Sequence, residues 1–141
     1  MGGMMTRHII SLALVLGFAI SAPGATLKSP DGRMEFALEV RDLDGRKGCP
    51  VYRVRWKGRE ILAESRLGME MEGGFLGEGI EIARVSPSSH DGTWRPVCGE
   101  RAEVRDRYNG LVGEFKGGGA FSLDVRAYEE GGAWRYLLPK V

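Results

Sequence analysis

The chain has 141 residues, of which 22 are glycine and 6 are proline, and its formal net charge is +1. Hydrophobic residues make up 43% of it, too many for a disordered chain of such low net charge. Collagen is excluded because no Gly-X-Y period is present. Frequent glycine disfavours helices, since each interior glycine costs a helix about 1 kcal/mol. The composition therefore predicts a small, turn-rich β protein of one domain.

The first predicted element is a signal peptide in residues 1–25. An apolar run covers residues 9–20, follows Arg7 and precedes several small residues. The run is shorter than the roughly 20 residues that a transmembrane helix needs, and this layout is typical of a secretion signal. We expect cleavage after Ser21 or after Ala25 and export to the periplasm or the medium. An uncleaved membrane anchor is the alternative.

Arg7 is the only charged residue before Lys28, so residues 26–141 carry equal numbers of basic and acidic side chains. A balanced charge argues against binding to nucleic acid or to an anionic membrane surface. We expect no nucleic-acid partner and no stable membrane insertion after the signal is cleaved.

Residues 26–141 are predicted to form an antiparallel β-sandwich. Apolar and polar residues alternate along most of this part, as in residues 33–40, where Met34, Phe36 and Leu38 share one face. No segment has a convincing helical period. The expected strands are, in chain order, 26–29, 33–40, 51–57, 59–63, 67–71, 80–85, 102–109, 110–116, 121–128 and 133–138.

The connections between these strands are predicted from their turn residues. Polar segments at 41–50 and 86–92 are expected to be loops, since neither alternates clearly. Three dipeptides are typical of tight two-residue turns: Asp31-Gly32, Lys57-Gly58 and Asn109-Gly110.

Cys49 and Cys98 are the only cysteines of the chain. In an exported protein they could form one disulfide, and closing a loop of about 50 residues would contribute roughly 4 kcal/mol in the chain-entropy model. Two free thiols are the alternative. We expect no metal site, because His90 is the only histidine after the signal and no Cys-x-x-Cys spacing occurs.

The densest group of recognition residues lies in the segment 91–109. Sugar sites combine an aromatic ring, which stacks on C–H groups, with polar side chains that fix the hydroxyls. The candidates of this kind are Trp94, Glu100, Arg105, Tyr108 and Asn109. In the alternative interpretation Trp94 packs inside the sandwich and Arg105 pairs with a carboxylate. We assign no catalytic residue, since a nucleophilic triad needs a histidine beside serine or cysteine and His90 lies in a polar segment.

Five motifs in this order resemble the N-terminal domain of glycoside hydrolase family 97, which contains α-glucosidases and α-galactosidases. The resemblance covers about residues 27–139. The motifs are Ser29-Pro30-Asp31-Gly32, Ser65-Arg66-Leu67-Gly68, Asp91-x-x-Trp94-x-Pro96-Val97-x-Gly99-Glu100, Arg105-x-x-Tyr108-Asn109 and Arg126-x-Tyr128-x-x-Gly131-x-Ala133-Trp134-Arg135-Tyr136.

The resemblance implies part of a β-supersandwich, similar to the galactose-mutarotase-like fold, packed on a catalytic (β/α)8 barrel. It implies a bacterial enzyme that is exported, acts on α-glucosides or α-galactosides, and holds Ca2+ near its active site. The catalytic glutamates of the family lie on the barrel, supplied in cis or encoded downstream. We therefore expect this chain to be inactive alone, to hold no cofactor and to be an incomplete N-terminal domain, with the five candidates above contacting either sugar or barrel.

Three functions follow from these observations. The first is a carbohydrate-binding and barrel-supporting domain of a family 97 enzyme. The second is a free-standing exported sugar-binding module. The third is a structural β-sandwich whose aromatic residues all belong to its core.

Overall fold

The computed structural model describes residues 24–139, which form ten β-strands and contain no helix long and apolar enough to cross a membrane. Every strand pair is antiparallel, and the predicted all-β sandwich is confirmed. The strands are β1 (Gly24–Lys28), β2 (Met34–Leu43), β3 (Arg46–Trp56), β4 (Arg59–Arg66), β5 (Met69–Met71), β6 (Gly74–Leu76), β7 (Ile80–Trp94), β8 (Val104–Gly117), β9 (Phe121–Tyr128) and β10 (Gly132–Leu137).

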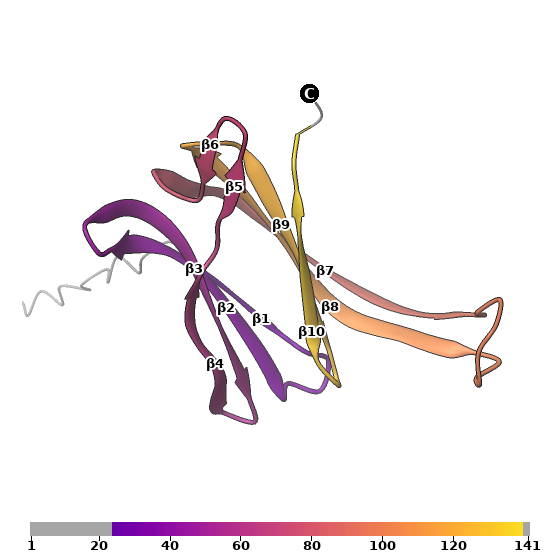
Figure 1. The fold of residues 1–141 in the computed structure, drawn as a ribbon. Helices are drawn as coiled ribbons and strands as arrows, with labels where there is room; N and C mark the ends of the chain where they lie inside the picture. The colour runs from indigo at the N-terminus through magenta and orange to yellow at the C-terminus, as the bar shows by residue number, and fades with distance from the viewer. Residues whose placement is uncertain (1–23, 140–141) are drawn as a thin grey trace, which may run out of the picture.

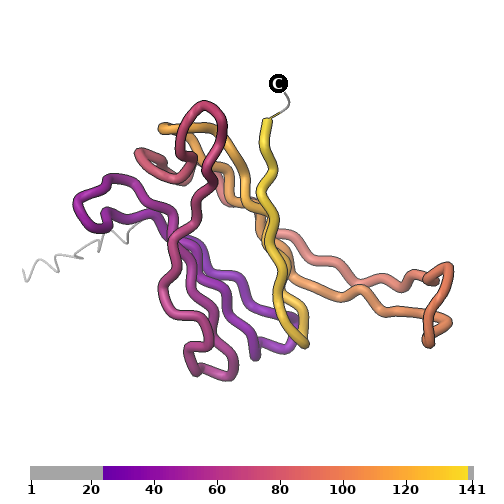
Figure 2. The backbone as a smooth tube through the Cα atoms, in the orientation of Figure 1, coloured from indigo at the N-terminus to yellow at the C-terminus, as the bar shows by residue number. Residues whose placement is uncertain are grey.

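Two four-stranded sheets form the layers of the sandwich (Figure 1). The first sheet has the order β1-β2-β3-β4 and the second the order β10-β9-β8-β7, with β5 and β6 forming a small separate hairpin. The tube in Figure 2 shows the chain finishing the first sheet before it enters the second. Neighbours in each sheet are therefore mostly neighbours in sequence, as in meandering antiparallel sheets.

The core lies between the inner faces of the two sheets. Met34, Phe36 and Leu38 are buried on β2, as the alternation predicts, and Leu123 and Val125 are buried on β9. Burial of these apolar inner faces is the main favourable contribution to such a fold, at about 25 cal/mol per Å² of apolar surface. This part of the chain, without the projecting half of β7 and β8, is called the body.

The polar loop predicted for residues 41–50 is wrong. Here β2 continues to Leu43 and β3 starts at Arg46, while Asp44 and Gly45 make the turn with φ angles of 51° and 78°. Two consecutive positive φ angles are the mark of a type I′ hairpin, which Asp-Gly favours. Asp44-Gly45 therefore makes this segment a tight hairpin, although the segment has few apolar residues.

The loop predicted for residues 86–92 and the turn predicted at Asn109-Gly110 are also wrong. Both β7 and β8 run through these positions, and Ser88 lies opposite Gly110 in an unbroken ladder. Gly110 is buried and lacks the positive φ of a type I′ turn. A Cβ at this position would collide with the Ser88 hydroxyl, so the glycine permits a close approach of the strands.

The predicted signal peptide lies outside the described residues, apart from its last two positions. Gly24 and Ala25 belong to β1 and lie opposite Glu39 and Leu38 of β2. The first strand thus begins two residues before the predicted domain boundary at residue 26.

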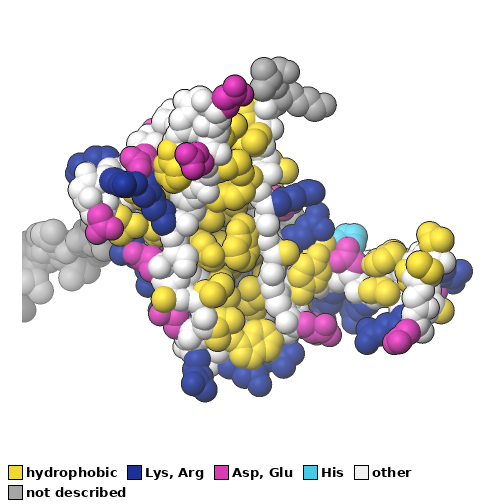
Figure 3. All heavy atoms as spheres, viewed as in Figure 1, with side chains coloured by type: hydrophobic (Ala, Val, Ile, Leu, Met, Phe, Trp, Pro, Cys, Tyr) yellow, Lys and Arg dark blue, Asp and Glu magenta, His cyan; other side chains and the backbone are white. Residues whose placement is uncertain are grey.

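One side of the sandwich is open between the edge strands β4 and β10. Ile61 and Leu62 of β4 and Trp134 of β10 line an apolar groove of about 270 Å3 there. Figure 3 shows hydrophobic side chains gathered along this opening. The Trp134 ring also packs on Tyr52 of β3, with 4.8 Å between ring centroids.

Candidate functional site

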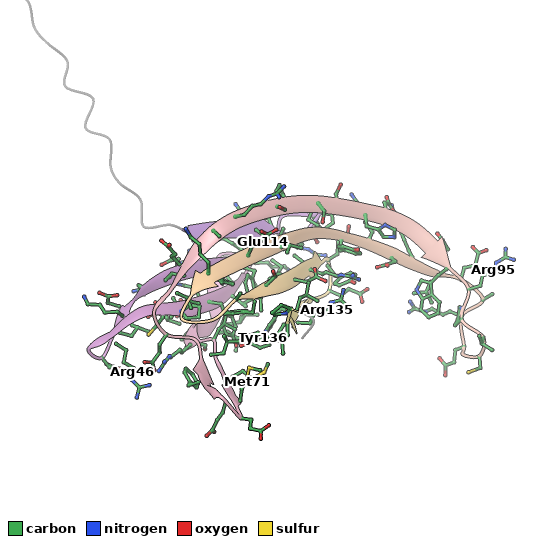
Figure 4. All side chains as sticks on the ribbon, turned by 90° about the horizontal axis from the view of Figure 1, so that it is seen from above. Arg46, Met71, Arg95, Glu114, Arg135 and Tyr136 are labelled. Atoms are coloured by element: carbon green, nitrogen blue, oxygen red, sulfur yellow. The ribbon has the colours of Figure 1, made fainter. Side chains whose placement is uncertain are left out.

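The β7–β8 hairpin continues beyond the body as a two-stranded arm, defined here as residues 88–108. Its tip is the connection between Trp94 and Val104, and β7 and β8 remain paired up to those two residues. Figure 4 shows the pair curving away from the body, with Arg95 at the far end. The segment with the sugar-site candidates therefore forms a projecting hairpin.

The register assigns the residues of the arm to two faces. Leu111 of β8 and Val125 of β9 lie opposite each other and are buried. Because side chains alternate along a strand, the odd-numbered positions of β8 share this inner face. Arg105 and Asn109 are therefore on the inner face, and Tyr108 is on the outer face.

Ion pairs occupy the inner face of the arm. The Arg105 guanidinium donates to both carboxylate oxygens of Asp91, at 2.9 and 2.8 Å. This hydrogen-bonded contact lowers the pKa of Asp91 below its ordinary value and raises that of Arg105. Arg107 donates to Glu129, with 2.9 Å between Nη1 and Oε1, so donors and acceptors alternate across this face.

Asn109 links the two sheets at the base of the arm. Its side-chain amide donates to the carbonyl oxygen of Lys28 at 2.8 Å. This contact joins β8 to β1 of the other sheet, and it fixes where the arm leaves the body.

An aromatic row crosses the outer face of the second sheet. It consists of His90, Tyr108 and Tyr128, with ring-centroid distances of 5.3 Å for the first pair and 5.2 Å for the second. The Arg126 guanidinium lies 4.6 Å from the ring centroid of Tyr108, within the range of a cation–π contact. Figure 3 shows basic, histidine and apolar side chains together where the arm leaves the body.

A notch forms where β9 ends and β8 continues. Tyr128, the last residue of β9, lies opposite Tyr108. The β8 residues from Val104 to Arg107 therefore have no paired strand on the β9 side. The notch has a volume of about 510 Å3, in the usual range of small-molecule sites. Its lining residues are Arg101, Val104, Arg105, Arg107, Tyr128, Glu129, Glu130, Gly131, Gly132 and Ala133.

A smaller groove of about 200 Å3 adjoins the notch on the outer face. Tyr128 and Ala133 line both hollows, and Asp124, Arg126 and Arg135 line the groove. Arg135 donates to Asp124 at 2.9 Å, so the groove also holds a donor beside an acceptor.

The five predicted site residues do not converge. Trp94 lies at the end of β7 with 53% of its surface exposed, and Glu100 lies in the exposed tip. Among the five, Arg105 alone lines the notch. Its pairing with Asp91 matches the alternative interpretation, whereas the exposure of Trp94 contradicts the packing of this ring inside the sandwich.

Sequence reasoning missed Tyr128 and the short segment 129–133 as site residues. The sequence signal for these residues is the motif that contains Tyr128, Gly131 and Ala133. Their role depends on where β9 stops relative to β8, which no local pattern reports.

The disulfide that the sequence left open is not present, and both cysteines are free thiols. Cys49 is buried on β3, whereas Cys98 is exposed in the tip of the arm. The alternative with two free thiols describes this structure.

The described residues offer no ligand set for the Ca2+ that the resemblance implies for the whole enzyme. Calcium binds six to eight oxygens, mostly from carboxylates and carbonyls. Within residues 24–139 no three side chains of His, Cys, Asp or Glu gather closely enough to hold a metal ion. The structure therefore supports no catalytic step through calcium on these residues.

Comparison with known proteins agrees with the architecture. The family model described as "Glycosyl-hydrolase 97 N-terminal" matches residues 27–141, almost the whole described part. The chain belongs to this family. The chain is 30% identical over 113 residues to a retaining α-galactosidase of Bacteroides thetaiotaomicron, covering 79% of the chain and 16% of that enzyme. It is 28% identical over 145 residues to a probable retaining α-galactosidase of Streptomyces bingchenggensis, covering 94% of the chain and 22% of the relative.

Solved structures give the same result. A family 97 enzyme of Pseudoalteromonas sp. strain K8 in complex with panose aligns with a TM-score of 0.74 at 26% identity. The same enzyme in complex with acarbose aligns with a TM-score of 0.73 at 27% identity. Each alignment covers 83% of the chain and 18% of the enzyme. The chain therefore spans less than a quarter of the length of these relatives.

Proposed function

We propose that this chain is the carbohydrate-binding and barrel-supporting N-terminal domain of an exported family 97 glycoside hydrolase. The match of a family N-terminal model to residues 27–141, in a chain that covers 16% of a retaining α-galactosidase, carries this proposal. The carboxylates that hydrolyse the glycosidic bond, and any Ca2+, belong to the barrel. The substrate class that fits the relatives is an α-galactoside or α-glucoside.

The arm provides a surface for the supporting role. Trp94 is about half exposed and Val97 fully exposed at its tip, and exposed apolar residues of this kind are typical of protein interfaces. The β7–β8 ladder continues to Trp94 and Val104, so the tip lies at the end of a regular two-stranded hairpin.

The DNA that follows codon 141 provides the most direct test of the supporting role. We expect it to encode, in frame or in the next frame, a (β/α)8 barrel with its catalytic glutamates. A stop codon followed by unrelated sequence would overturn this role and favour a free-standing sugar-binding module.

Export is tested by the mass of the processed protein. We expect cleavage after Ser21, because cleavage after Ala25 would remove two residues that pair with β2. Mass spectrometry of the product from a bacterial periplasm distinguishes the two sites. A product that keeps residue 1 would overturn the exported part of the proposal.

A further inference from the structure

β10 is an edge strand of the second sheet, and in the described part of the chain only β9 pairs with it (Figure 1). It pairs with β9 through six consecutive residues without a bulge, and Arg135 is its only charged residue. Trp134 is 36% and Leu137 is 39% exposed. A flat, regular and largely apolar edge of this kind is a template for pairing with another extended chain.

The other three sheet edges carry features that oppose such pairing. β1 has only five residues, and β4 contains four charged residues and two irregularities in its register with β3. β7 contains Pro87, which has no N–H to donate, and its register shifts between Ile82 and Arg84. Short strands, charges, prolines and bulges all protect sheet edges, so β10 is the edge best suited to a partner.

The pairing of β10 with β9 determines which backbone groups face the free edge. Next to the turn, the Tyr128 N–H donates to the carbonyl oxygen of Gly131 at 2.8 Å. Hydrogen-bonded residues alternate along an antiparallel pair, so the odd-numbered residues of β10 bond to β9. The N–H and C=O groups of Gly132, Trp134 and Tyr136 therefore point away from β9, where an extended segment could pair with them.

A second copy of the chain matches this edge in the antiparallel orientation. When Trp134 of each copy lies opposite the other, Gly132 faces Tyr136 of the second copy. In the same register Ala133 faces Arg135 of the second copy, so no like charges are opposed. Moving one copy by two residues toward the other end would place the two Arg135 side chains opposite each other, which is unfavourable. The register centred on Trp134 pairs every outward backbone group of β10.

We propose that two copies of the chain associate through β10, in antiparallel register centred on Trp134, and form one continuous sheet. The apolar groove of each copy adjoins this edge, since Gly132 and Trp134 line it. Ile61 and Leu62 on its other wall are 59% and 42% exposed, so association places two exposed apolar grooves side by side. An interface that uses the same surface on both copies closes with two molecules. The inference goes beyond the proposed function, because it requires neither a ligand nor a barrel.

Sedimentation equilibrium of the chain purified from a bacterial periplasm tests this interface. We expect a monomer–dimer equilibrium in which the dimer fraction rises with protein concentration. Ala133 is exposed, so its side chain can be changed without repacking the core. Ala133→Glu should tighten association about threefold to tenfold, because the two symmetric contacts each place a carboxylate opposite Arg135. Ala133→Lys should weaken association by a similar factor, because like charges then face each other.

Hydrogen exchange followed by NMR tests the same edge at single amides. The amides of Gly132, Trp134 and Tyr136 face solvent in the monomer and should become protected as the protein concentration rises. Those of Ala133 and Arg135 bond to β9 in either state, so their exchange should depend little on concentration.

A control variant and the direction of each effect distinguish this interface from others. Ala63→Lys makes the same substitution at an exposed position of β4 and should leave association unchanged. A cooperative thermal transition for every variant establishes that it is folded.

Three results would overturn the proposal. A folded chain that stays monomeric at every concentration would exclude a second copy as the partner and leave this edge to an extended segment from elsewhere in the enzyme. A dimer that Ala133→Glu weakens would exclude the register centred on Trp134, because two glutamates face each other when the pairing is centred on residue 133. A dimer that Ala63→Lys weakens and Ala133→Lys does not would place the interface on β4.

Discussion

The body and the arm share strands β7 and β8 but are stabilised by different interactions. In the body, the inner faces of central strands such as β2 and β9 are buried against the other sheet, and residues such as Leu38 and Leu123 have no exposed surface. In the arm, β7 and β8 continue without a second layer, and cross-strand contacts such as Arg105 with Asp91 hold them. Regular β structure therefore extends well beyond the region where burial supports it.

Removing a buried side chain from the body is expected to lower the stability of the protein more than any change in the arm. Leu123→Ala should destabilise the protein by about 2–5 kcal/mol, the usual cost of a leucine deletion in a packed core. Urea unfolding followed by circular dichroism measures this change.

Leu62→Ala is the matched control at the open side of the body. Leu62 is 42% exposed, so its truncation should cost less than about 1 kcal/mol. Equal losses for the two variants would contradict the position of the core between the sheets.

A smaller effect is expected where the arm joins the body. Gly110→Ala should destabilise the protein by about 1–2 kcal/mol, because the added methyl group would collide with the Ser88 hydroxyl. The double variant with Ser88→Gly should recover most of this loss. If Gly110 were the turn residue that the sequence suggested, Ser88→Gly would bring no recovery.

The same comparison explains which parts of the fold could be predicted from the sequence. Alternation reports burial on one face, so it located the strands of the body, for example residues 33–40. The arm has polar residues on both faces, and its β7 half was therefore predicted as a loop at 86–92. Asn109-Gly110 carries a strong turn signal, but the pairing of β8 with both β7 and β9 overrides it.

The candidate site was predictable in its residue types and in their faces on the strand, but not in its shape. Arg105 and Tyr108 are three residues apart in the predicted strand 102–109, so alternation already places them on opposite faces. The notch arises because β9 ends at Tyr128 while β8 continues to Val104. That difference in strand length is a non-local property.

The exposed ring of Trp94 should contribute little to stability, in contrast to the rings of the body. Trp94→Ala should change the free energy of unfolding by less than about 0.5 kcal/mol, as for most surface substitutions. Urea unfolding measures this change as well. A loss above about 2 kcal/mol would mean that the tip folds back onto the body in solution.

The smallest effect is a local response of the arm to acid. The hydrogen bonds from Arg105 lower the pKa of Asp91, so the folded arm binds a proton more weakly at this carboxylate than the unfolded chain does. The stabilisation is therefore present above the ordinary aspartate pKa of about 3.9 and is lost as the pH falls through the lowered value in the fold.

In the body, the Ser29 hydroxyl is the main cause that lowers the pKa of Asp31 to about 2. Carboxyl NMR should thus show both groups titrating below 3.9, and amide exchange in the arm should accelerate over the range where Asp91 titrates. Asp91→Asn should remove the part of this response that depends on Asp91 and leave the titration of Asp31 unchanged. An unaltered response of the arm in that variant would show that its sensitivity to acid does not come from Asp91.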